Sequence, residues 1–279
     1  MDYSKVDLTF FAWSDAHLGY AQRFGAPDIR GDAVEQMKRL PGWPYPETVG
    51  GYVESPEFII HCGDIVDGEK QPPGDVKFGY FRHLTSKLNI PHYEVLGNHE
   101  ITGNNKPFME YFIKRYGTKS YIFAKQDINF ISLAGEYDEK ERGAIPGTEL
   151  EFLEKTLHAT GVKAPVVLFL HSPLNDLKNR DAVINLLKKY NVILSIAGHK
   201  HRPGVFETGG IPCVNIGHCR NHPIDPEYGR SFYVIRIKDE SITAVPWRWD
   251  MKEWERGEGW SSNPEDTAKQ LILTAKWRY

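Results

Sequence analysis

Short apolar runs alternate with amphipathic segments as far as residue 201, and this alternation constrains the fold more than any other feature of the chain. Apolar runs of about four to eight residues are typical of buried strands, because helices need about ten residues or more. Strands that alternate with amphipathic helices predict α/β architecture. The strand-like runs are 8–14, 58–62, 92–96, 121–124, 129–133, 166–170 and 192–197.

Helix-like segments lie between these runs. They fall near 30–40, 76–89, 107–116, 148–160 and 180–190. In the stretch "TELEFLEKTLHA" we expect Thr148 to cap the helix, because Glu151 follows it by three residues as in a capping box.

Beyond residue 201 the pattern changes to strands without helices. The stretches "SFYVIRI" and "ITAVPWRW" predict a hairpin that turns at 238–240. The segment 41–57 is rich in proline, glycine and aromatic residues and predicts a long loop. We therefore expect one domain over 1–279, with an inserted loop at 41–57 and a C-terminal hairpin and tail at 231–279.

Composition excludes several classes of function. The net charge is −3 and basic residues are mixed with acidic ones, which argues against a dedicated nucleic-acid surface. The longest apolar stretches are far shorter than the roughly 20 residues of a membrane span. Three cysteines are too few and oddly numbered for a disulfide framework, and no secretion pattern opens the chain. We expect a protein of the cytoplasm that does not enter a membrane.

Polar residues that can bind metal follow the ends of five predicted strands. In open α/β sheets the loops beyond the carboxyl ends of the strands build the ligand site, so these residues are expected to converge. Asp15 and His17 are two apart in the chain and can point the same way. The full set is Asp15, His17, Asp64, Asn98, His99, His171, His199 and His201.

Each of these elements has a plain structural alternative when it is taken alone. Asp15 fits a surface turn, His17 a hydrogen-bonded core imidazole, and the "GHKH" stretch at 198–201 an exposed polar turn. Their shared position at strand ends favours the metal-site interpretation of the whole set.

The blocks "DAH" at 15–17, "GD" at 63–64, "GNHE" at 97–100, His171 and "GHKH" at 198–201 resemble the signature of the calcineurin-like metallophosphoesterase superfamily. This resemblance implies a four-layer α/β/β/α sandwich with a two-metal site at one edge. It also implies that Asp15, His17 and His201 hold one ion, and that Asn98, His171 and His199 hold the other. Asp64 would bridge the two ions, and His99 would stand near the leaving group.

The implied activity is that of an enzyme that hydrolyses a small-molecule phosphoester, either a phosphodiester or a phosphomonoester. Imidazole, carboxylate and amide ligands suit manganese, iron or zinc, as two divalent or mixed-valence ions, better than calcium or magnesium. A metal-bridging hydroxide would attack phosphorus, since such ions lower the pKa of bound water toward about 7. His99 would donate a proton to the leaving oxygen.

Two alternatives from other classes stay open at this point. A non-catalytic metal-binding interaction module with the same fold should have lost ligands, and a nuclease should carry a basic groove. Purple acid phosphatases have a metal-bound tyrosine at the position of Asp67, which argues against their coloured iron centre here. Asp67 itself fits either a role in orienting a ligand or a solvated loop. The loop at 41–57 fits either a lid over the substrate or a surface flap, and the oligomeric state is left open.

Overall fold

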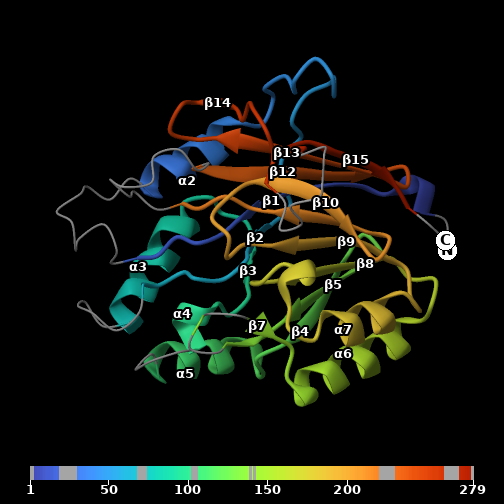
Figure 1. The fold of residues 1–279 in the computed structure, drawn as a ribbon. Coiled ribbons are helices and arrows are strands. Elements are labelled where there is room, and N and C mark those ends of the chain that lie inside the picture. The colour runs from blue at the N-terminus through green and yellow to red at the C-terminus, as the bar shows by residue number, and fades with distance from the viewer. Residues whose placement is uncertain are drawn as a thin grey trace.

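The computed structural model describes residues 3–18, 30–67, 74–101, 106–137, 140, 143–219, 230–260 and 270–277. Two β-sheets pack face to face, and helices lie on their outer sides (Figure 1). This is the predicted four-layer α/β/β/α arrangement.

The first sheet has seven strands, in the order β14-β13-β12-β1-β2-β3, with β15 also paired to β13. β1 pairs in parallel with β2 and antiparallel with β12, so the C-terminal hairpin is built into the middle of the sheet. The strands are β1 (Asp7–Trp13), β2 (Ile59–His61), β3 (His92–Glu94), β12 (Ser231–Lys238), β13 (Ser241–Arg248), β14 (Glu253–Trp254) and β15 (Leu273–Lys276).

The second sheet has six strands, in the order β10-β11-β9-β8-β5-β4, and is parallel from β11 to β5. Its strands are β4 (Tyr121–Lys125), β5 (Ile128–Leu133), β8 (Val166–Leu170), β9 (Val192–Ala197), β10 (Gly204–Thr208) and β11 (Ile211–Asn215). A separate two-stranded hairpin joins β6 (Glu136–Tyr137) to β7 (Gly143–Ala144). The parallel strands of both sheets deliver the loops at their carboxyl ends to one edge of the molecule.

Helices cover the outer sides of the two sheets (Figure 1). α6 (Gly147–Thr160) and α7 (Arg180–Leu187) pack their leucines against the outer face of the second sheet. The others are α2 (Arg30–Arg39), α3 (Gly74–Ser86), the single-turn α4 (Asn98–Ile101) and α5 (Lys106–Tyr116), with 3₁₀ turns η1 (Tyr3–Lys5) and η2 (Leu174–Asp176).

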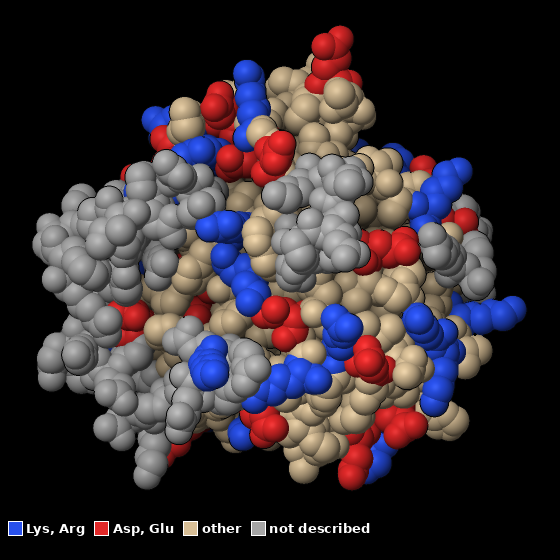
Figure 2. Space-filling view, viewed as in Figure 1, with Lys and Arg blue, Asp and Glu red and all other residues tan. Residues whose placement is uncertain are grey.

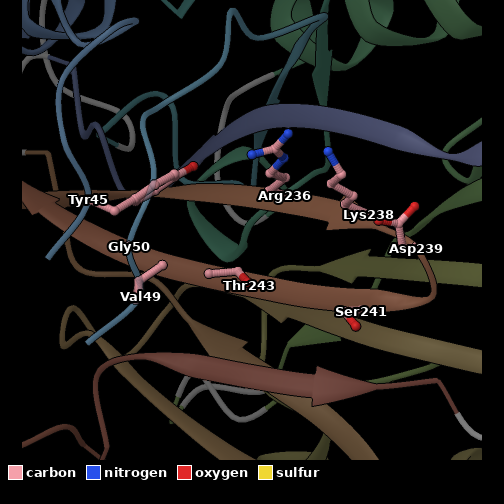
Figure 3. Close-up of a pocket in the computed structure, with 8 residues that line it drawn as sticks. All are labelled: Tyr45, Val49, Gly50, Arg236, Lys238, Asp239, Ser241 and Thr243. Carbon is pink, nitrogen blue, oxygen red and sulfur yellow. The ribbon is translucent and has the colours of Figure 1, made fainter. Parts of the chain in front are cut away.

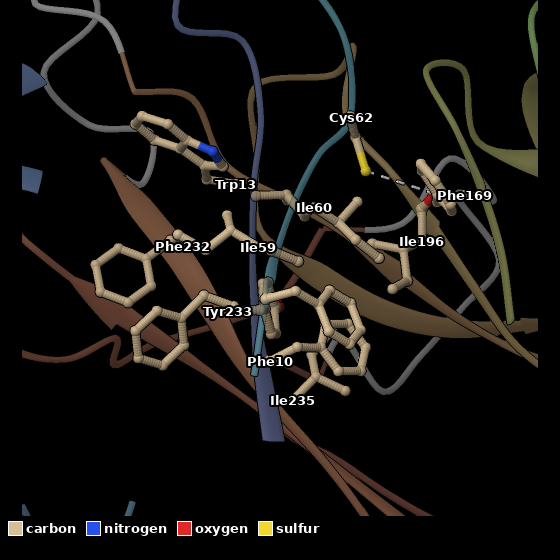
Figure 4. Close-up of a cluster of buried hydrophobic side chains, with 14 of the residues drawn as sticks. Phe10, Trp13, Ile59, Ile60, Cys62, Phe169, Ile196, Phe232, Tyr233 and Ile235 are labelled. Carbon is tan, nitrogen blue, oxygen red and sulfur yellow. Dashed lines mark hydrogen bonds between the residues drawn. The ribbon is translucent and has the colours of Figure 1, made fainter. Parts of the chain in front are cut away.

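The main core lies between the sheets and follows the period-two alternation of their strands. Phe10 of β1 stacks on Phe58 at 4.9 Å and meets the edge of Phe130, from the other sheet, at 5.5 Å. Figure 4 shows side chains of both sheets meeting in this core, where the Cys62 thiol donates to the carbonyl of Ile196. Because aromatic and aliphatic side chains interlock here, the sheets hold their edges in a defined relative position.

Most predicted elements lie where the pattern placed them, within a few residues at their ends. The hairpin turn is Asp239–Glu240, and both residues have positive φ, as a tight two-residue turn requires. The predicted cap at Thr148 is wrong. The helix begins at Gly147, and the cap position is held by Pro146, whose backbone is extended and whose ring has no acceptor atom, so no side chain caps the helix.

The segment 41–57 folds back on itself through a bridge between Pro44 and Tyr52 and lies on the outer side of the first sheet. Its Trp43 meets the edge of Trp247 at 5.5 Å, and its Tyr45 stacks on Trp254 at 5.5 Å. These contacts fix Trp43 and the buried Tyr45 against tryptophans of the first sheet.

A pocket of about 290 Å³ separates this segment from β12 and β13. Figure 3 shows Arg236 and Lys238 reaching from β12 toward β1, where both form ion pairs with Asp7. Asp7 is the first residue of β1, whereas Asp15 lies two residues beyond its last residue, Trp13. The pocket therefore lies at the opposite end of β1 from the predicted metal-binding residues.

Candidate metal centre

The structure brings all eight predicted site residues together at one edge of the sandwich. Each lies just past the carboxyl end of a strand: β1, β2, β3, β8 or β9. The residues are Asp15 and His17, then Asp64, then Asn98 and His99, then His171, and finally His199 and His201.

A first set is formed by Asp15, His17 and His201. The Nε2 atoms of His17 and His201 are 3.1 Å apart, and Asp15 Oδ1 lies 3.6 Å from the former and 3.1 Å from the latter. All three present acceptor atoms to a common point, which is the arrangement of ligands around a cation.

A second set is formed by Asn98, His171 and His199. Asn98 Oδ1 is 2.9 Å from His171 Nε2 and 3.0 Å from His199 Nδ1, and the two ring nitrogens are 3.2 Å apart.

Asp64 stands between the two sets. Its Oδ2 is 3.7 Å from His17 Nε2 and 3.2 Å from His171 Nε2. Its Oδ1 accepts the backbone N–H of His99 at 2.9 Å. This position is the one that a carboxylate shared by two ions requires.

The donor atoms fit metal ions in spacing as well as in type. Ligand atoms about 2.0–2.1 Å from one tetrahedral zinc ion lie about 3.4 Å from each other. The separations of 3.1 and 3.2 Å between imidazole nitrogens are close to that value. Asp15 Oδ1 is also buried without a hydrogen bond, which a bound cation would compensate. A site for two metal ions is therefore compatible with the residues present.

The backbone of the site is strained. Asp15, His17, Asp64, His199 and His201 all have φ between 43° and 69°. Non-glycine residues seldom adopt this left-handed conformation, and each costs on the order of 1–3 kcal/mol. Such outliers cluster where a fold positions groups for a function rather than for stability.

Two motif glycines let the backbone approach the carboxylates. A Cβ atom at Gly198 would collide with the side chains of Ser14 and Asp15, and one at Gly97 would collide with Asp64. The glycines of "GNHE" and "GHKH" are thus explained by close packing against ligand residues.

Burial and neighbouring charges set the protonation of the ligands. Burial lowers the pKa of His17 to about 3 and that of His199 to about 4, so both imidazoles are neutral, which is the form that binds metal. Burial acts against the charged form of His171 too, but the charge of Asp64 raises the pKa of this histidine to about 10. The same histidine holds the pKa of Asp64 below its usual range despite the burial of this carboxyl.

Sequence patterns did not assign the residues that hold these loops in place. The buried Glu100 carboxylate accepts the backbone N–H groups of Asp64, Val66 and Gly97 at 2.8, 2.9 and 2.7 Å. Arg30, also buried, donates to the carbonyl oxygens of Ala16 and His17 at 2.7 and 2.9 Å. Glu100 belongs to the "GNHE" block, whereas no local pattern marks Arg30.

Asp67 is buried beside the site, not on a solvated loop. Its Oδ1 lies 3.5 Å from His99 Nδ1 and 3.9 Å from His17 Nδ1. It is therefore placed to orient one or both imidazoles.

Residues 9–203 match the sequence model of calcineurin-like phosphoesterases, and this range contains all eight site residues. The chain is 30% identical over 161 residues to a probable glycerophosphodiester phosphodiesterase of Arcobacter nitrofigilis, a match over 53% of this chain and 57% of that protein. It is 26% identical over 171 residues to a probable cyclic nucleotide phosphodiesterase of Xenorhabdus bovienii, over 57% of this chain and 67% of that protein.

The fold is similar to that of a dimetal phosphatase from Danio rerio, with a TM-score of 0.66 and 16% identity. The alignment covers 97% of this chain and 99% of that one. This likeness confirms the predicted fold class.

Proposed function

The chain belongs to the calcineurin-like phosphoesterase family, and from this premise we propose that it hydrolyses small organic phosphodiesters at a centre for two transition-metal ions. The observation that carries the proposal is that Asp64 lies between the two sets, with its Oδ2 3.7 Å from His17 Nε2 and 3.2 Å from His171 Nε2. A non-catalytic module would not need both sets intact together with His99 beside them.

Asp15, His17 and His201 would hold one ion, and Asn98, His171 and His199 the other, with Asp64 between them. We propose manganese, iron or zinc, because nitrogen and oxygen donors are mixed. When bound, such ions acidify water and neutralise charge on the phosphoryl group.

His99 supplies a proton to the leaving oxygen in this proposal. Its side chain is 26% exposed, and its Nε2 lies 3.8 Å from Asp64 Oδ2, at the open side of the site. Asp67 Oδ1, at 3.5 Å from Nδ1, orients the ring. Proton transfer of this kind contributes about 10² to 10⁴-fold to rate.

Phosphodiesters of small size are favoured over nucleic acids as substrates. Of the curated relatives, one is named as a probable glycerophosphodiester phosphodiesterase and the other as a probable cyclic nucleotide phosphodiesterase. Figure 2 shows acidic and basic residues interspersed over the visible face, in line with a net charge of −3. A groove that binds nucleic acid needs clustered positive charge to neutralise phosphates.

We further propose a reducing location such as the cytoplasm, since Cys62, Cys213 and Cys219 are buried free thiols. Among the described residues, none of the helices is both long and apolar enough to cross a bilayer.

Metal analysis combined with a screen of phosphate monoesters and diesters tests the proposed function. The parent protein should bind two transition-metal ions and hydrolyse diesters in their presence. Asp64→Asn should lower bound metal and abolish hydrolysis, because one carboxylate oxygen becomes an amide that cannot bind a cation. Asp181→Asn, at a side chain that is 85% exposed, is the matched control. Equal metal content and activity in Asp64→Asn and the control would refute the assignment.

A further inference from the structure

Tyr137 lies against the second set, from a segment that carries no predicted ligand. It ends β6, and its partner across the small hairpin is Gly143 of β7. β6 also packs against α4, which begins with Asn98. The hairpin therefore touches the elements that present the second set.

The ring of Tyr137 contacts both imidazoles of the second set. Its centroid is 5.9 Å from that of His171, at 71°, and 6.0 Å from that of His199, at 42°. The two imidazole centroids are 4.9 Å apart, so the three rings form a closed triangle. In such a triangle neither imidazole can rotate freely without striking the tyrosine ring.

Gly143, the partner of Tyr137 across the hairpin, packs against the tyrosine ring and against Ser172, which follows His171 in sequence. A Cβ atom at Gly143 would lie 2.5 Å from Ser172 Oγ and 3.2 Å from Tyr137 Cε1. The glycine backbone thus lies directly against both side chains. Tyr137 is held between this backbone and the His171 loop, which leaves its ring little freedom to move.

We propose that Tyr137 is a positioning residue for the second set: its ring, packed against the backbone of Gly143, fixes the orientation of His171 and His199. The inference rests on the proposed two-ion site. It predicts that binding of the ion at the second set depends on a residue that binds no metal, while binding at the first set does not depend on it.

Metal titration of the metal-free protein by calorimetry tests this, with manganese or zinc as the probe. Tyr137→Ala should weaken binding of one of the two equivalents by about 10 to 100-fold, the usual effect of removing a group that orients a ligand. The other equivalent should be unchanged. Tyr137→Phe keeps the ring and should bind both ions as the parent does. Tyr52→Ala, at a tyrosine that is 64% exposed, is the matched control and should bind both ions as the parent does.

Ligand variants identify which ion is affected. In a His199→Ala background, which already disables the second set, Tyr137→Ala should weaken metal binding no further. In a His201→Ala background, which disables the first set, the effect of Tyr137→Ala should persist. The opposite pattern, or equal loss of both equivalents from the Tyr137→Ala single variant, would overturn the inference.

The two proposals fail differently. A parent protein that binds fewer than two ions defeats the proposed function, and this inference with it. A parent that binds two ions with unchanged affinities in Tyr137→Ala defeats the inference alone. If the alanine variant does not fold, Tyr137→Leu decides, because it fills much of the space without a planar ring, and parent-like binding of both ions by it overturns the inference.

Discussion

Replacing Glu100 by glutamine should destabilise the metal-free protein by an amount that its hydrogen bonds define. One oxygen, Oε2, accepts from Asp64 and Gly97, and the other, Oε1, accepts from Val66. In the Glu100→Gln variant the side-chain oxygen can still accept from the N–H groups of Asp64 and Gly97. The side-chain NH₂ group then faces the N–H of Val66, which loses its acceptor. Because a buried donor left without an acceptor costs about 1–3 kcal/mol, the free energy of unfolding should fall by that amount.

Burial and the charge of Asp64 raise the pKa of Glu100 to about 8, so urea denaturation at pH 9, where the side chain is a carboxylate, in the presence of a chelator measures this loss. Glu151→Gln is the control, because the Glu151 side chain is 72% exposed and a surface change there should stay within about 0.5 kcal/mol. Metal affinity should fall as well, since Glu100 positions the backbone of Asp64. A loss in Glu100→Gln no larger than that of the control would show that these backbone contacts do not hold the loop.

Three further outcomes are expected. His99→Ala should retain both ions and slow esters with poor leaving groups by about 10² to 10⁴-fold, with less effect on nitrophenyl esters; loss of metal would make His99 a ligand instead. Burial lowers the pKa of His61 to about 3 from 6.5, so between these values the unfolded state binds the extra proton. The contribution of His61 to the free energy of unfolding is therefore fully present above pH 6.5 and is lost as the pH falls toward 3. His61→Phe should make the free energy of unfolding fall less steeply in this range, by about 1.4 kcal/mol per pH unit. Parallel curves of unfolding free energy against pH for the variant and the parent would exclude the effect. Tyr45→Ala should lower the free energy of unfolding by about 3 kcal/mol without changing KM, because Tyr45 is only 7% exposed and stacks on Trp254; a raised KM for large diesters would restore the lid alternative.

The order of elements and the eight site residues could be predicted from the sequence, because both depend on local pattern. Apolar runs of strand length and amphipathic helices can be recognised from about ten consecutive residues. Parallel strands then bring their carboxyl ends to one edge of the sheet. Asp15 and His171 could therefore be expected to meet, although 156 positions separate them, from 15 to 171. The family resemblance then implied a division of these residues between two ions, which stays a prediction.

Only the tertiary structure decided what surrounds those residues. Glu100 binds the backbone at Asp64, 36 residues away, and Trp254 donates to the carbonyl of Pro44 from 210 residues away. Tyr137 lies against His171 and His199 without any motif that marks it. The positive φ angles of the ligand loops are equally invisible to local propensity, since aspartate and histidine favour other conformations in isolation. Such contacts and strains exist because the packed core holds the sheets in a defined relation, and that relation is a property of the whole fold.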